Sequence, residues 1–221
     1  MSLNWEYIIR FLPMYEKALW LTLKLSFWGI LFAFIIGMVC SIVTFYKVRV
    51  LSQIVNGYVA FFRNTPLLIQ LFFMFYGLPK IGLTLSPEVT AVIGLSLLGG
   101  SFMAEAFRGG IEAVAKSQLE SGVAIGLNKF QLARYVILPQ ALSYSVPALG
   151  ANCIFLIKET SICSGIAILD LTNTAKDLIG MYYKTNESLL MLVVGYLIIL
   201  LPVSILLTFI ERKVRYAEFG H

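Results

Sequence analysis

Two short segments of this sequence combine charged and hydroxyl side chains in patterns that could bind a small charged molecule. The first, Lys158-Glu159-Thr160-Ser161, places adjacent opposite charges beside two hydroxyl groups at the end of an apolar stretch. A zwitterion needs a partner for each of its charges once water is removed, and a neighbouring cation and carboxylate supply both. The alternative is an ordinary helix terminus that faces water, and the residues themselves leave both interpretations open.

The second segment is Arg63-Asn64-Thr65-Pro66. Pro66 removes a backbone donor and disfavours helix at Thr65, which predicts a kink or a broken helix inside an apolar stretch. The half-helix after the break would present N–H groups and a positive dipole end, which suit a carboxylate. Arg63 adds formal charge, and a charge within a membrane needs a cavity or a partner. The alternative is that Arg63 extends to the membrane interface.

The elements that must position these segments are apolar helices. The 221 residues are 59% hydrophobic and 13% charged, whereas a soluble domain carries about 25% charged residues. Because backbone polar groups must be satisfied in lipid, the apolar blocks are expected to be helices. The sequence therefore predicts an all-α integral membrane protein with a single domain (residues 1–221, core about 14–215) and five transmembrane helices: Leu25–Tyr46, Val50–Pro79, Val89–Ala104, Tyr135–Ile157 and Ser188–Ile210.

A shorter segment, Asp170–Gly180, is too polar and too short to span a membrane. We expect it to form an amphipathic helix that packs back against the bundle, with Asp170 and Lys176 as solvated charges on its face. Glu105 and Arg108 are three residues apart on a predicted helix, so we expect them to pair with each other.

Basic residues predict the orientation, because loops on the cytoplasmic side carry an excess of Lys and Arg. Six basic residues, interleaved with acids, fall on the side predicted to be external: Arg10, Lys17, Lys80, Lys158, Lys176 and Lys184. Nine fall on the other: Lys47, Arg49, Arg108, Lys116, Lys129, Arg134, Arg212, Lys213 and Arg215. The rule predicts an external N-terminus and a cytoplasmic C-terminus.

Between the third and fourth blocks, Gln118–Pro139 predicts two short helices joined at Gly126, which adopts the left-handed conformation at little cost. Asn128 can cap the second helix, with Gln131 reaching back three residues later. Pro139 suits the first turn of a following helix. One face of the second helix is apolar: Leu127, Phe130, Ala133 and Ile137.

Glu120, the small pair Ser121-Gly122, Gly126 and the run that ends at Pro139 resemble the EAA loop of ABC-importer permeases. The family pattern has two alanines where this chain has Ser121 and Gly122. The resemblance implies a type I ABC importer fold in which a cytoplasmic coupling loop, about residues 108–138, docks into a groove on an ATP-hydrolysing subunit. An ordinary amphipathic hairpin at the membrane interface is the alternative.

Three further segments resemble permeases that import polar amino acids: Phe61–Leu68 with Phe75–Pro79, Phe102–Ile111 and Lys158–Ser161. Asn64 and Ser117 stand where that group usually has Gly. The resemblance implies a permease subunit in the bacterial plasma membrane, with no cofactor of its own, since ATP and magnesium bind the partner ATPase. It also implies an extracytoplasmic binding protein and dimerisation with itself or a sister permease, in contact with membrane lipid but not with nucleic acid.

Catalytic patterns are missing from the sequence. It has no Gly-x-x-x-x-Gly-Lys-Ser/Thr segment for ATP hydrolysis, and its one histidine is His221, so neither a Ser/His/Asp set nor a zinc site is expected. An integral-membrane enzyme is therefore the weakest alternative. The stronger ones are an ABC permease for another solute, such as a metal chelate or methionine, and a gated channel or secondary carrier.

Overall fold

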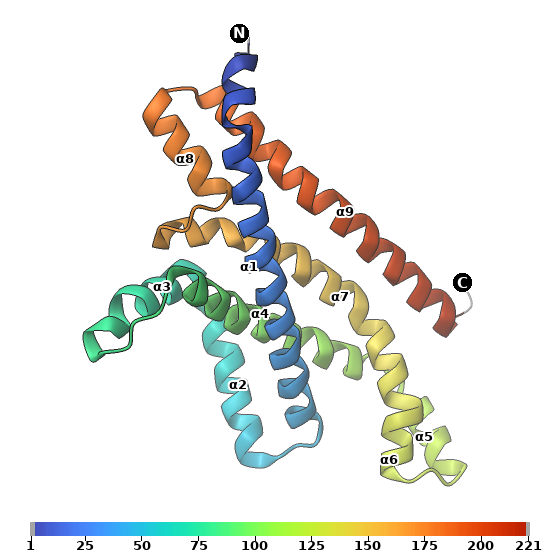
Figure 1. Ribbon diagram of the computed structural model, residues 1–221. Helices are drawn as coiled ribbons and strands as arrows, with labels where there is room; N and C mark the ends of the chain where they lie inside the picture. The colour runs from blue at the N-terminus through green and yellow to red at the C-terminus, as the bar shows by residue number, and fades with distance from the viewer. Residues whose placement is uncertain (1–2, 220–221) are drawn as a thin grey trace.

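The computed structural model describes residues 3–219, and in that range the chain is helical with no strand (Figure 1). His221 lies outside the described residues, as do the side chains beyond Val214. The α-helices are α1 (Trp5–Phe45), α2 (Arg49–Asn64), α3 (Leu67–Phe72), α4 (Pro87–Glu112), α5 (Lys116–Ala124), α6 (Lys129–Leu132), α7 (Leu138–Glu159), α8 (Leu171–Tyr182) and α9 (Thr185–Phe219). The predicted all-α fold is confirmed.

Four of the helical segments are long and apolar enough to cross a membrane, and the bent pair formed by α2 and α3 makes a fifth if it counts as one span. That pair bends by 105°. The break lies where Pro66 predicted it, with Thr65 in an extended conformation. After α3 the chain forms a π-helical turn (Phe73–Gly77) and a 3₁₀ turn (Leu78–Ile81).

Helix α4 lies at the centre of the molecule, between α1 and α7 (Figure 1). Small residues on its surface let the neighbouring helices approach closely, as is usual between helices in membranes. A Cβ atom added to Gly99 would lie 2.5 Å from Leu156 of α7 and 2.8 Å from Ala33 of α1. Gly37 of α1 meets α4 in the same way, against Met103. Gly99 and Gly37 therefore fix how α1, α4 and α7 stack.

Helix α1 begins 20 residues before the predicted start of the first span. Charged residues interrupt the apolar run before Leu25, so hydropathy does not include this segment in the span, but tertiary contacts keep the segment helical. Tyr7, Phe11 and Tyr15 are buried, and the Tyr15 hydroxyl donates to the Ser188 carbonyl at 2.8 Å. The first third of α1 therefore packs against α8 and α9.

The fourth span also starts earlier than predicted. The helical segment runs from Lys129 to Ile166 without interruption, through a π-helical turn at Ala133–Ile137. The second helix of the predicted elbow and the fourth span are thus one continuous segment. Pro139 does not end the helix, because it lies within the first two positions of α7, where a missing backbone N–H is tolerated.

Helix α8 confirms the predicted amphipathic helix, and it packs on α9 and α1. Lys176 is exposed as expected. The expectation for Asp170 is wrong, because its side chain is completely buried at the start of α8. It caps the helix by accepting from the Asn173 N–H at 2.9 Å.

Candidate functional site

The elbow between α4 and α7 consists of α5, a turn and α6 (Figure 1). Gly126 has a φ of +84°, so the left-handed turn predicted there is confirmed. The capping box is confirmed as well: the Asn128 Oδ1 accepts from the Gln131 N–H at 3.0 Å, and the Gln131 Oε1 accepts from the Asn128 N–H at 2.9 Å. Local sequence therefore shapes the elbow, and the molecule holds it at the end opposite the N-terminus (Figure 1).

Of the residues expected to couple to a partner, three lie in α5, and the other two, Gly126 and Pro139, follow in the turn and at the start of α7. Glu120 and Ser121 are exposed, whereas Gly122 is buried and faces α6. A Cβ at Gly122 would lie 2.5 Å from Leu132 Cδ1, so the glycine allows α5 to lie close to α6. Phe130 is exposed rather than part of a covered apolar face. The elbow thus presents one carboxylate and one aromatic ring to its surroundings, a mixed surface that suits a protein partner.

At the broken span, Arg63 forms an ion pair with a carboxylate of another helix. Its Nη1 lies 3.1 Å from the Glu105 Oε2 of α4, and its guanidinium lies 5.2 Å from the centre of the Phe102 ring. Glu105 also receives two hydrogen bonds from Arg108, at 3.1 and 2.8 Å, so the predicted pair of Glu105 and Arg108 is confirmed. The Glu105 carboxylate therefore pairs with two guanidinium groups, those of Arg63 and Arg108.

These charges border a polar cavity of about 470 Å³ between α2 and α4. Its lining residues are Asn56, Val59, Ala60, Arg63, Asn64, Phe102 and Glu105. Asn64 is exposed here, although its side-chain amide donates to the Ala60 carbonyl at 2.7 Å. A space of this size with both signs of charge and one ring can accept a small zwitterion.

The break after Arg63 is held together by side chains that replace the missing helical hydrogen bonds. The Thr65 hydroxyl donates to the Phe61 carbonyl at 2.8 Å. Gln70 is buried and its amide donates to the carbonyls of Phe62 and Thr65, at 3.2 and 2.9 Å. The helical segment that begins with α3 continues through the π-helical and 3₁₀ turns to Ile81, so a positive dipole end lies directly after the break.

The second candidate segment lies where α7 gives way to a 3₁₀ turn (Thr160–Ile166). Lys158 is exposed, and Glu159 and Ser161 are partly exposed. Thr160 is completely buried, and its hydroxyl donates to the Ile157 carbonyl at 2.7 Å. The two charges and Ser161 are therefore the members of this segment that reach the surface.

An aromatic contact connects the two candidate segments. The Phe102 ring, which lies under Arg63, has its centroid 5.2 Å from that of Phe155 on α7. Phe155 and Lys158 are three residues apart in one helix and so share a face. The structure thus brings Arg63 and Glu105 near the face of α7 that carries Lys158. The sequence predicted only the pairing of Glu105 with Arg108, because its contact with Arg63 depends on how α2 packs against α4.

Among the described residues, no cluster of three or more His, Cys, Asp and Glu side chains could hold a metal ion.

Comparisons with known proteins identify the family to which this chain belongs. Residues 29–216 match the family described as the inner membrane component of binding-protein-dependent transport systems. The chain is 35% identical over 214 residues to the probable amino-acid permease protein YxeN of Bacillus subtilis, which covers 96% of each chain. It is 29% identical over 217 residues to the glutamine transport system permease protein GlnP of Escherichia coli, covering 97% of this chain and 99% of that one.

Solved structures agree with the family match. An amino acid ABC transporter, crystallised with histidines, superposes with a TM-score of 0.90 at 29% identity, over 96% of this chain and 100% of that one. The MetNI methionine ABC transporter shares the fold, with a TM-score of 0.75 at 21% identity over 93% and 98% of the two chains. This chain therefore belongs to the family of inner membrane components of binding-protein-dependent transport systems and has the fold of ABC importer permeases.

Proposed function

We propose that this chain forms the translocation pathway for polar amino acids in an ATP-driven importer of the plasma membrane. The observation that carries the proposal is the polar cavity between α2 and α4. An ion pair borders this cavity, with the Arg63 Nη1 3.1 Å from the Glu105 Oε2. A cavity bordered by both signs of charge favours a solute pathway over a purely structural role. The zwitterionic charge pattern supports an amino acid over a metal chelate, and the relative named as a glutamine permease supports a polar amino acid over methionine.

The remaining parts of the proposal follow from the fold. The elbow carrying Glu120 would dock on a partner ATPase, which binds ATP and magnesium, so that this chain needs no cofactor. A binding protein would deliver the solute on the side of the N-terminus, and a second permease, identical or a sister chain, would complete the pathway. Closure of the ATPases would then move the elbows and alternate access to the cavity.

Transport by the assembled importer in proteoliposomes tests the substrate site. Lys158→Met, Glu159→Gln and Arg63→Met each remove one charge, so the opposite charge of a bound amino acid loses its partner, which costs about 2–5 kcal/mol in a desolvated site. We expect each change to abolish uptake of the radiolabelled amino acid while basal ATP hydrolysis continues, and Lys158→Arg to retain part of it.

Lys176→Met is the matched control, because Lys176 is an exposed lysine of α8 that belongs to neither segment. It should transport normally. Normal uptake by all three test variants would show that these charges are solvated or structural, and would place the pathway elsewhere in this chain or in its partner.

A further inference from the structure

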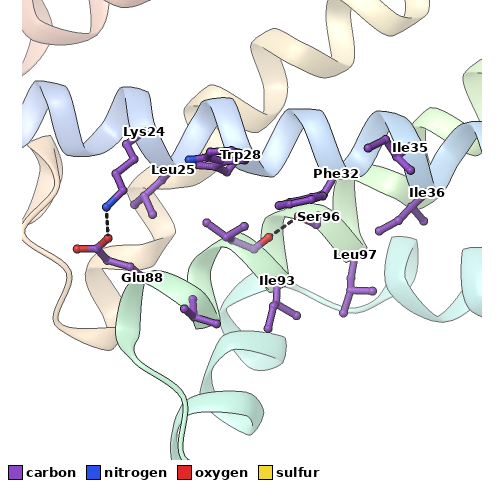
Figure 2. Close-up of a pocket in the computed structure, with 12 residues that line it drawn as sticks. Lys24, Leu25, Trp28, Phe32, Ile35, Ile36, Glu88, Ile93, Ser96 and Leu97 are labelled. Carbon is purple, nitrogen blue, oxygen red and sulfur yellow. Dashed lines mark hydrogen bonds and ion pairs between the residues drawn. The ribbon is translucent and has the colours of Figure 1, made fainter.

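A groove of about 630 Å³ runs between α1 and α4, outside the polar cavity (Figure 2). Side chains of both helices form its walls: Leu25, Trp28, Phe32, Ile35 and Ile36 from α1, and Val89, Val92, Ile93, Ser96 and Leu97 from α4. The Ser96 hydroxyl donates to the Val92 carbonyl of its own helix. The interior of the groove therefore offers a continuous apolar surface.

One end of the groove is charged. The Lys24 ammonium and the Glu88 carboxylate approach to 2.7 Å there, and Figure 2 shows both side chains at this end. Their side chains are 58% and 49% exposed. The bond between them uses one of three ammonium donors and one of two carboxylate oxygens, so both groups keep hydrogen-bonding capacity. An exposed pair of this kind adds little stability.

A molecule that fits both regions has a long apolar chain and a headgroup with one negative and one positive charge. From Lys24 to Ile36 the groove follows 13 residues of α1, and the 12 helical rises between them correspond to about 18 Å of helix. Half the hydrocarbon core of a bilayer is about 15 Å thick, so the groove is about as long as one leaflet is deep. Both α1 and α4 belong to segments that can cross a membrane.

We propose that this groove binds one phospholipid whose headgroup carries a primary amine, as phosphatidylethanolamine does. The phosphate accepts from Lys24, the ammonium donates to Glu88, and an acyl chain lies against Trp28 and Phe32. An anionic lipid would satisfy Lys24 but would be repelled by Glu88. A choline headgroup has the same charges but no N–H donor for the carboxylate, so it fits less well.

Trp28 supplies a probe within the groove. The chain has three tryptophans, so Trp5→Phe together with Trp20→Phe leaves Trp28 as the single fluorescent indole. This full-length variant is reconstituted in vesicles that contain, in turn, the same small fraction of acyl-brominated phosphatidylethanolamine, phosphatidylcholine or phosphatidylglycerol. We expect quenching of Trp28 to report a local enrichment of the ethanolamine lipid of about two- to fivefold, as exposed charge pairs allow.

The enrichment should disappear in Lys24→Gln and Glu88→Gln, and it should persist in Lys17→Gln, which changes an exposed lysine of α1 outside the groove. Equal quenching by the three brominated lipids would overturn the proposal. So would a Trp28 that no brominated lipid quenches, because a second protein chain would then cover the groove.

Discussion

Asp170 carries a buried charge whose removal should stabilise the protein. Its side chain is completely buried, one carboxylate oxygen accepts from the Asn173 N–H, and the other oxygen has no hydrogen-bond partner. Burial raises the pKa of Asp170 from 3.8 to about 6, although the bond from Asn173 acts in the opposite direction. The fold therefore favours the protonated form of this side chain.

The pH dependence follows from the two pKa values. Because the folded pKa is the higher one, the folded state binds more protons between about pH 4 and pH 6, and stability falls as the pH rises through that range. Each pKa unit corresponds to about 1.4 kcal/mol, so the ionised carboxylate costs about 3 kcal/mol above pH 6. The contribution is fully present below about pH 4 and is lost at neutral pH.

The variant Asp170→Asn removes the charge and keeps an oxygen that can cap α8. Its added N–H₂ group lacks a partner in the wild-type surroundings, which reduces the expected gain to about 1–2 kcal/mol at pH 7.5. For a chain of this size we expect the melting temperature of the purified permease to rise by about 3–8 °C. At pH 4.5 the rise should vanish or reverse.

Asp177→Asn is the control, since Asp177 is an exposed carboxylate of the same helix, and it should change the melting temperature little at either pH. A difference between Asp170→Asn and the wild type that stays constant from pH 4.5 to pH 7.5 would refute the assignment of a buried, titrating carboxylate. A loss of stability at pH 7.5 would do the same.

Three more perturbations address the elbow, the orientation and the broken span. Glu120→Arg and Gly126→Val should each reduce transport severalfold with insertion intact, the second because a left-handed φ costs a β-branched residue about 1–2 kcal/mol; wild-type uptake by both would exclude coupling through the elbow. A cysteine at Tyr183 should react with an impermeant thiol reagent in intact cells, whereas one at Ser117 should react only after lysis. Gln70→Leu leaves two carbonyl groups at the break unpaired and should lower the free energy of unfolding by about 1–3 kcal/mol in a denaturant titration.

Features that depend on a few neighbouring residues could be predicted from the sequence. The left-handed Gly126, the capping box of Asn128 and Gln131, and the break before Pro66 each follow from backbone rules that act over four or five residues. Hydropathy in the same way locates the helices that are long and apolar enough to cross a membrane.

Features that depend on tertiary contact could not be predicted. Asp170 resembles a solvated helix cap in the sequence, and only the packing of α1, α8 and α9 around it makes it buried. The early start of α1 has the same origin, because Tyr7 and Tyr15 hydrogen-bond to Ser188, more than 170 residues away. Hydropathy contains no information about such contacts.

The pairing of Arg63 with Glu105 changes how the candidate site must work. An unpaired Arg63 would attract a substrate carboxylate directly, but this guanidinium is already bound, so a carboxylate has to compete with Glu105. Arg108 makes that exchange feasible, because it holds the same Glu105 oxygen at 2.8 Å and would keep the carboxylate neutralised when Arg63 leaves. Under the proposed function, the shared carboxylate lets Arg63 change partners without leaving Glu105 unpaired in the cavity, where an uncompensated charge is costly.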